Sequence, residues 1–190
     1  IHINIEENYT SLVLLDYPPK INTDMNYNIF IDPRCSNLRH KIIINSHLVD
    51  NFVLINKLKK IDFQSYRELM IKNLIPYSPK DLTINKSLLL ENNFDTINAI
   101  DWDKGCYIGQ EITARMKYRA LLKKSIRAIE IISGKVNPGN KITNDTNIIG
   151  EIISCFNNLA IAMLKIDDAN NAFKKEKVLK TDSANLKIIR

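Results

Sequence analysis

The sequence lacks the motifs of several large enzyme classes. It contains no Walker loop, no G-x-S-x-G elbow and no H-E-x-x-H helix. P-loop phosphoryl transfer, hydrolase chemistry of the nucleophile-elbow type and zincin proteolysis therefore have no support. It also has no run of about 18 apolar residues, so we expect no membrane span. The chain begins at Ile1 without a signal-peptide pattern, and we interpret it as a fragment or a gene product without its N-terminal part.

Cysteine is scarce: Cys35, Cys106 and Cys155 are the three in the chain. No two lie at metal-ligand spacing, so we expect no metal site. An odd number argues against a disulfide framework and favours a reducing compartment. Cys35 and Cys155 fall in or beside expected strands, where we expect small buried residues. His40 and His47 have no matching ligand pattern and are expected to be ordinary histidines.

The composition is that of a folded globular chain, with 45% hydrophobic and 25% charged residues among 190. That length can bury one large core or two small ones. The net charge is +6. A basic balance allows binding to nucleic acid, to an anionic cofactor or to an acidic partner. A lysine-rich surface without such a role explains the same charge, and no basic group is flanked by aromatics as in an RNA-stacking strand.

The first half of the chain carries short runs rich in Ile and Val that predict strands of a mixed sheet. They cover residues 1–5, 11–16, 28–32 and 40–45. From about Asp62 to Leu74 the apolar residues recur at helical spacing, and Pro76 ends the pattern. Residues 77–93 have no clean period and predict a surface loop.

After Leu121 the pattern indicates β structure. The expected strands cover residues 125–132, 147–155, 159–166, 178–180 and 186–189, with a turn at 137–140. Together they predict a small antiparallel barrel. We place a domain boundary near Leu121, which gives domains of residues 1–120 and 121–190.

The segment Asp101–Arg119 is the most informative part of the sequence. Two of only five glycines, Gly105 and Gly109, lie within it, and glycine permits positive φ and close backbone approach. A helix is expected from Gln110 to about Arg119, with Glu111 and Arg115 on one face. Cys106 would then precede a helix N-terminus and follow Lys104, and both features favour the thiolate. A plain loop-to-helix junction, with Cys106 as a small hydrophobe, explains the same residues.

The octapeptide Lys104–Glu111, KGCYIGQE, resembles the K-G-C-[FY]-x-G-Q-E signature of the YgfZ family, which is related to the T-protein (aminomethyltransferase) of the glycine cleavage system. Weaker similarities flank it, and they extend over roughly residues 29 to 168. They are Asp101–Asp103, Ala114–Met116, Tyr118–Arg119, Ile75–Pro76 after a helix with Tyr66 and Arg67, Glu91–Asn92, Ile31–Arg34, Ile149–Ser154 and Leu159–Ala162. The sequence departs from the family at Ala99 and Ala120, where glycine is usual.

The resemblance implies an α+β fold. A folate-binding, T-protein-like α/β domain, N-terminally incomplete at residues 1–120, precedes a small antiparallel β-barrel at residues 121–190. The implied cofactor is tetrahydrofolate or a one-carbon folate derivative. The family's cysteine falls on Cys106, and a low-pKa thiol there could attack a one-carbon unit, act in redox chemistry or touch a cluster transiently.

The site residues that the resemblance implies fall into two groups. Cys106 and Lys104 are the candidates for chemistry. The candidates for binding the cofactor are Gly105, Tyr107, Gly109, Gln110, Glu111, Arg115, Arg119 and Glu91. Trp102 is either a stacking platform for the pterin or the core anchor of a strand.

The function implied is that of an accessory protein for the assembly or repair of iron–sulfur enzymes, tRNA-modifying ones included. Its partners would be iron–sulfur enzymes or assembly factors, with a weak tRNA contact and no membrane. An aminomethyltransferase-like one-carbon enzyme is the alternative, although the T-protein counterpart has no cysteine at this place. An RNA-binding module and a decayed fragment are further alternatives. The expected location is the bacterial cytoplasm, or otherwise the mitochondrial matrix.

Overall fold

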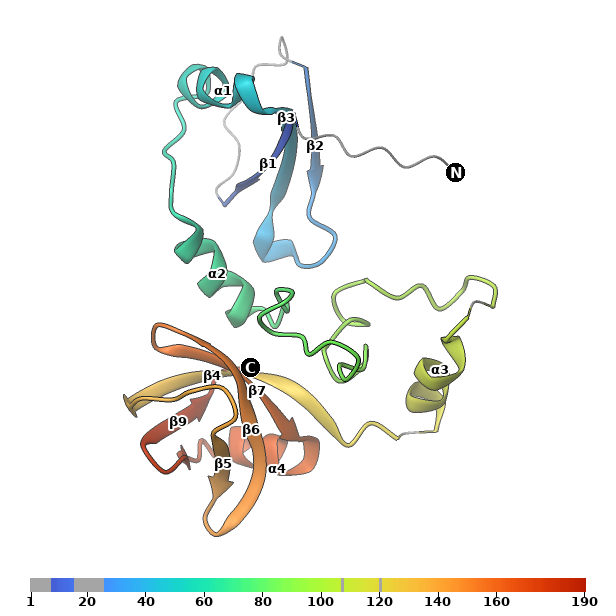
Figure 1. Cartoon of the computed structure of the whole chain (residues 1–190), viewed down its shortest axis with the longest axis vertical. Helices are drawn as coiled ribbons and strands as arrows, with labels where there is room; N and C mark the ends of the chain where they lie inside the picture. Colours follow the sequence, from blue (N-terminus) through green and yellow to red (C-terminus); the bar gives the residue numbers. More distant parts are fainter. Residues whose placement is uncertain (1–7, 16–25, 107, 120) are drawn as a thin grey trace. The chain divides into compact units, whose positions relative to one another are not determined.

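The computed structural model describes residues 8–15, 26–106, 108–119 and 121–190. The chain forms two compact units, residues 1–65 and 66–190 (Figure 1). The strand expected at residues 1–5 lies outside the described residues. In the part of the chain that the structure describes, no helix has the length and apolarity that a membrane span needs.

The first unit holds a three-stranded sheet. Its strands are β1 (Tyr9–Leu14), β2 (Tyr27–Ile31) and β3 (His40–Asn45), in the order β1-β3-β2. Both pairings are antiparallel, so the expectation of a mixed sheet was wrong. The reason is the short connection between β2 and β3, which contains only the 3₁₀ turn η1 (Ser36–Leu38). A parallel pairing needs a crossover of a dozen residues or more.

Alternation along β3 decides which face of this sheet is buried. Ile42 and Ile44 point to the same side and are fully buried, while Ile43 between them is exposed. The turn η2 (Ser46–Leu48) leads into α1 (Val49–Ile55), whose Phe52 packs on those two isoleucines. The sequence pattern did not predict α1.

The second unit begins within α2 (Phe63–Lys72), which confirms the helix expected at about 62–74. The helix buries Arg67, Met70 and Ile71. Residues 73–106, which follow, form turns with neither helix nor strand, as expected for the loop at 77–93. The segment is not confined to the surface, because Asp81, Leu90 and Asn92 are buried. Local hydrogen bonds shape them, such as the one that the Phe94 amide donates to the Leu89 carbonyl at 3.1 Å.

Residues after Leu121 form a closed antiparallel barrel in the order β4-β7-β6-β5-β8-β9. The strands are β4 (Lys124–Gly134), β5 (Lys141–Asn144), β6 (Asn147–Phe156), β7 (Leu159–Lys165), β8 (Leu179–Lys180) and β9 (Ala184–Ile188). The expected small antiparallel barrel is thereby confirmed. The sequence pattern missed β5 and the helix α4 (Ile166–Lys174).

The barrel wall is apolar on both sides over part of its circumference. Inward side chains such as Ile129, Ile152 and Leu164 form the barrel core, which the buried Ala169 and Ala172 of α4 complete. Outward side chains of β4 and β7, among them Ile126, Ala128 and Ile161, form a second cluster with Ile71 and Leu74. That cluster ties α2 and the residues just after it to the outside of the barrel.

Candidate functional site

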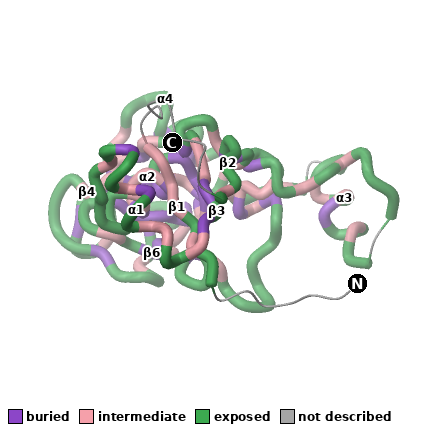
Figure 2. The backbone as a smooth tube through the Cα atoms, turned by 90° about the horizontal axis from the view of Figure 1, so that it is seen from above, coloured by how far each residue is buried: buried purple, intermediate pink, exposed green. Residues whose placement is uncertain are grey.

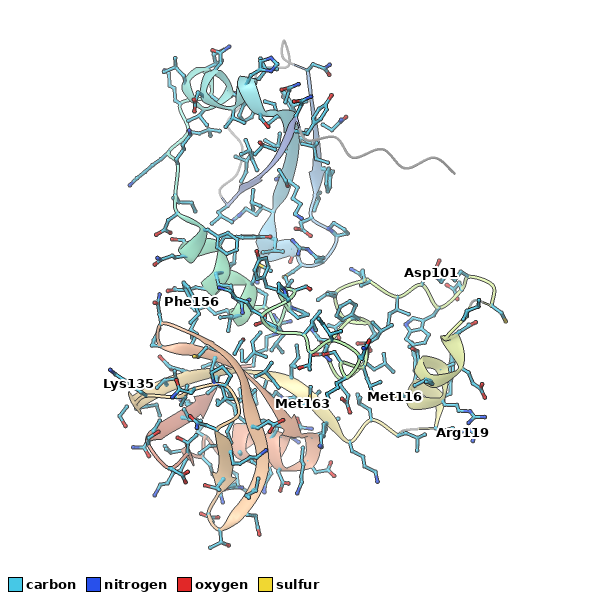
Figure 3. The ribbon with its side chains drawn as sticks, viewed as in Figure 1. Asp101, Met116, Arg119, Lys135, Phe156 and Met163 are labelled. Carbon is cyan, nitrogen blue, oxygen red and sulfur yellow. The ribbon has the colours of Figure 1, made fainter. Side chains whose placement is uncertain are left out.

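The candidate site is built on α3 (Gln110–Tyr118), which confirms the helix expected after Gly109. Gly109 is the N-cap residue and has φ of 89°, a left-handed conformation that glycine adopts without steric cost. Glu111 lies in the first turn, and Arg115 and Lys117 lie in the last. The helix dipole therefore stabilises the negative charge at the N-terminal end and the positive charges at the C-terminal end. Figure 3 shows Asp101, Met116 and Arg119 on the loop and helix that form this site.

Glu111 and Arg115 form the expected ion pair, with 2.5 Å between Arg115 Nη2 and Glu111 Oε1. Their side chains are 73% and 56% exposed, so solvent screens the pair and its contribution to stability is small. The Arg119 amide donates to the Arg115 carbonyl at the end of the helix. Arg119 itself is exposed. Both arginines can therefore be reached by an anionic ligand.

Trp102 packs on the other end of α3. The Lys117 ammonium lies 3.6 Å from the centre of its ring, and Tyr118 meets it edge-on with 6.2 Å between ring centroids. No strand forms around Trp102, so its interpretation as the core anchor of a strand was wrong. Because Lys117 occupies one face of the indole, Trp102 joins the start of the site loop to the last turn of the helix.

The residues between Trp102 and α3 form an exposed loop, most of which is green in Figure 2. Lys104, Gly105 and Cys106 are all exposed, and Gly109 follows them at the helix start. A side chain at Gly105 would meet no atom within 4 Å, so no packing requirement explains this glycine. Tyr107, an expected binding residue, lies outside the described residues. Gln110 opens the helix and is half-buried.

Glu91, an expected binding residue, belongs to a different part of the chain from α3. It is half-buried in the turns that follow α2. Its carbonyl accepts a hydrogen bond of 2.9 Å from the Ile126 amide of β4. The barrel wall therefore holds the main chain of this carboxylate in place.

Sequence reasoning missed a buried polar network in the same unit. Arg67 Nη2 lies 2.5 Å from Asp81 Oδ1, and the Ser154 hydroxyl donates to the same oxygen at 2.5 Å. The Tyr77 amide donates to the other oxygen, Oδ2, at 2.6 Å. All three side chains are at least nine-tenths buried. The available signal was an arginine between the apolar positions of α2, since a buried charge requires a partner.

A second carboxylate is held in the first unit, within the expected element Ile31–Arg34. Asp32 is 2% exposed and accepts two hydrogen bonds from the Arg34 guanidinium, at 3.0 and 2.7 Å. Burial by itself would raise the pKa of the Asp32 carboxyl. The hydrogen bonds from Arg34 and the charges of Arg34 and Lys41 outweigh it, so the pKa lies below its ordinary value.

The cysteines differ from expectation in one case. Cys35 is half-buried, but Cys155 is exposed, and its thiol lies 3.6 Å from the Val136 carbonyl. The expectation that Cys155 is buried was therefore wrong. Cys155 is the last residue but one of β6, and the alternation of side chains along the strand turns it to solvent. Among the described residues, no group of three His, Cys, Asp or Glu side chains is placed to hold a metal ion.

Comparison with known proteins gives a family relation for the barrel. Residues 123–190 match the family "CAF17, C-terminal beta-barrel domain". The chain is 31% identical over 134 residues to the mitochondrial "Iron-sulfur cluster assembly factor IBA57 homolog" of Dictyostelium discoideum, which covers 65% of this chain and 33% of the relative. The mouse mitochondrial factor IBA57 is 30% identical over 117 residues, covering 59% and 32%. The chain thus spans about a third of the length of these relatives.

A solved structure shows the same fold at greater sequence distance. The glycine cleavage system aminomethyltransferase T from Bartonella henselae superposes with a TM-score of 0.56 at 10% identity, over 85% of this chain and 48% of that one. At this identity the likeness concerns the fold alone. The chain is therefore similar in sequence to IBA57-type iron–sulfur cluster assembly factors, matches the CAF17 C-terminal β-barrel family over residues 123–190, and resembles the T-protein in fold.

Proposed function

We propose that this protein is a folate-binding accessory factor for the assembly or repair of iron–sulfur enzymes, of the YgfZ type. The observation that carries the proposal is the similarity, over 65% of the chain, to a protein named as an iron–sulfur cluster assembly factor. The relatives are mitochondrial, which favours the mitochondrial matrix over the bacterial cytoplasm. Iron–sulfur enzymes or assembly factors are the proposed partners.

The residues of the site fit tetrahydrofolate in their chemistry. Folate carries an anionic glutamate tail, and the exposed Arg115 and Arg119 offer guanidinium groups to it. The pterin has a guanidine-like edge that pairs with a carboxylate, for which Glu91 and Glu111 are the candidates. Of these, Glu91 is half-buried and anchored to the barrel, whereas Glu111 already pairs with Arg115. Glu91 is therefore the better candidate for the pterin, and Arg115 and Arg119 are the candidates for the tail.

Four further residues complete the proposed cofactor contacts. Gly105 and Gly109 let a ligand approach the backbone of the loop, because neither meets neighbouring atoms. Tyr107 and Gln110 are assigned to the cofactor by the resemblance alone. When bound, tetrahydrofolate would supply a carrier for one-carbon groups.

Cys106 and Lys104 are the proposed reactive pair. Both are exposed on the loop ahead of α3, so a thiolate at Cys106 would be open to a folate-bound group or to a client protein. Lys104 supplies a positive charge two residues away, and reactive cysteines lie in exposed, electropositive surroundings of this kind.

The test is rescue of an iron–sulfur enzyme in cells that lack their own IBA57-type factor. The protein, expressed with its natural start, should restore the enzyme's activity, and Cys106→Ser should lower the restored activity at equal expression. Cys155→Ser is the matched control, because Cys155 is also exposed but lies on the barrel. Failure of the unaltered protein to restore activity would overturn the proposal.

An aminomethyltransferase-like enzyme is the second candidate, favoured by the T-protein fold. It predicts folate-dependent cleavage of an aminomethyl group on a lipoyl carrier protein. Activity in that assay, without rescue of iron–sulfur enzymes, would select the enzyme. A weak tRNA contact also belongs to the proposal, and salt-dependent tRNA binding would test it.

A further inference from the structure

A basic pocket of about 210 Å³ lies on the outside of the barrel. Four strands contribute to it: β4, β5, β6 and β7. Its polar lining consists of Lys124, Lys141, Lys165 and Glu151, and its apolar lining includes Ile148 and Met163. Met163 also borders the apolar cluster on the outer face of β4 and β7. The same face of the barrel therefore changes from apolar to basic beyond Met163.

Two of these lysines form an unfavourable pair that the fold does not compensate. Lys124 and Lys165 are direct cross-strand partners in the register of β4 and β7, and like charges in that position destabilise a sheet. Both are exposed. Among residues that the structure describes, neither has a carboxylate oxygen within ion-pair distance. Lys165 Nζ donates only to the Ile148 carbonyl, at 3.2 Å.

The acidic side chains that the structure describes near the pocket form no ion pair with Lys124 or Lys165. Glu151 pairs with Lys141 across β5 and β6. Asp167 and Asp168 line an adjoining pocket that shares Lys124 and Lys165. They occupy the first turn of α4, where carboxylates stabilise the helix N-terminus.

The charge of the whole protein is concentrated on this domain. Residues 121–190 contain twelve Lys or Arg and seven Asp or Glu, so they carry five of the six net positive charges. Such a field attracts anions to the barrel and raises their local concentration. The pocket is lined by Lys124 and Lys165, neither of which forms an ion pair with a described residue.

We propose that this pocket binds a phosphate group, with Lys124 and Lys165 as its two ligands. Lysine binds phosphate as a point charge, and three N–H donors on each ammonium can reach the oxygens of one anion. A bound dianion would convert the repulsion between the two strands into attraction. The phosphate can belong to a small phosphorylated molecule or to the backbone of a nucleic acid. This site is independent of the folate site proposed above.

The test uses pyrophosphate and the ¹⁵N-labelled full chain. Amide shifts should be concentrated at Lys124, Gly150 and Lys165, and the variant K124Q/K165Q should bind at least tenfold more weakly. The matched control is K135Q/K180Q, which removes two exposed barrel lysines outside the pocket. Figure 3 shows Lys135 on the opposite side of the barrel from Met163. The control should bind as the unaltered chain does.

Two further measurements make the test decisive. K124Q/K165Q should have a Tm no lower than that of the unaltered chain, since the variant loses a like-charge pair. A Tm at or above that value shows that the loss of binding does not come from misfolding. A single-stranded oligonucleotide identifies the source of the phosphate: tighter, steeply salt-dependent binding indicates nucleic acid, and binding no tighter than pyrophosphate indicates a small molecule. No binding of either probe, or equal losses in both double variants, would overturn the proposal.

Discussion

The Lys117 ammonium lies 3.6 Å from the centre of the Trp102 ring. The contact closes a loop of 14 residues, 103–116, that contains Lys104, Gly105, Cys106 and Glu111. The loop itself is exposed, and Gly105 packs against nothing within 4 Å. The contact between Trp102 and the helix therefore holds together the two ends of the candidate site.

Removal of this cation should expose the indole. Trp102 is the single tryptophan of the chain, so tryptophan fluorescence reports on the surroundings of this one side chain. Lys117→Gln removes a cation–π interaction of about 0.5–1 kcal/mol. We expect greater quenching of the emission by acrylamide, while Lys135→Gln, remote on the barrel, leaves it unchanged. Equal quenching in the unaltered chain and Lys117→Gln would show that the contact does not persist in solution.

Cys106 should be the first cysteine to react with an alkylating agent. Cys106 and Cys155 are both exposed, so access alone does not separate them. Cys106 has Lys104 two residues before it and the start of α3 after it, and reactive cysteines lie in exposed, electropositive surroundings of this kind. Cys155 instead donates to the Val136 carbonyl. Mass spectrometry after short exposures measures the order, and equal rates at the two sites would refute the special setting of Cys106.

The buried Asp81 should matter far more to stability than exposed carboxylates do. Asp81→Asn leaves Arg67 as an uncompensated charge with less than a tenth of its surface exposed. Removal of one partner of a buried pair costs about 3–5 kcal/mol in free energy of unfolding. Glu151→Gln, which removes an exposed ion pair of the same unit, should cost less than about 1 kcal/mol. Denaturant unfolding of the two variants gives the comparison.

A double variant separates the pairing from the burial. Arg67→Met with Asp81→Leu removes both charges, so its cost should be smaller than the sum of the two single changes. Additive costs would mean that the two side chains do not stabilise each other.

Asp32 should make the stability of the first unit depend on pH in the acidic range. Its pKa is lower in the folded protein than the ordinary value of 3.8. The stabilisation is therefore fully present above the unfolded pKa and is lost as the pH falls through the folded value. Unfolding of the unaltered chain and of Asp32→Asn, measured at neutral pH and again below about pH 4, tests this. The difference in free energy of unfolding between the two proteins should be smaller at the acidic pH. A difference that is the same at both pH values would contradict the assignment.

The sequence predicted those elements whose local pattern agrees with their final environment. The strands of the barrel alternate or run apolar, and α3 begins at a glycine with an acidic first turn, so each could be placed within a few residues. β5 was missed because Lys141–Asn144 contains one buried apolar residue, Ile142. α1 was missed because its seven residues are too few to show a period. The antiparallel sheet was mispredicted because pairing direction depends on contacts distant in sequence.

The candidate site shows the same division. The pair Glu111–Arg115 follows from helical spacing, which is local. The network of Arg67, Asp81 and Ser154 joins residues up to 87 positions apart, and no local pattern encodes it. The anchoring of Glu91 to Ile126 is a main-chain contact, to which the side-chain sequence gives no clue.

We propose that this chain carries a folate site built from Glu91 and the segment Lys104–Arg119. Calorimetric titration with tetrahydrofolate polyglutamate tests it most directly, on this chain and on the protein extended to its natural start. We predict binding that is weaker for the present chain and is lost when Glu91 and Arg115 are changed to Ala, while Lys135→Ala has no effect. Absence of binding by the extended protein, or binding unaffected by those two changes, would contradict the claim.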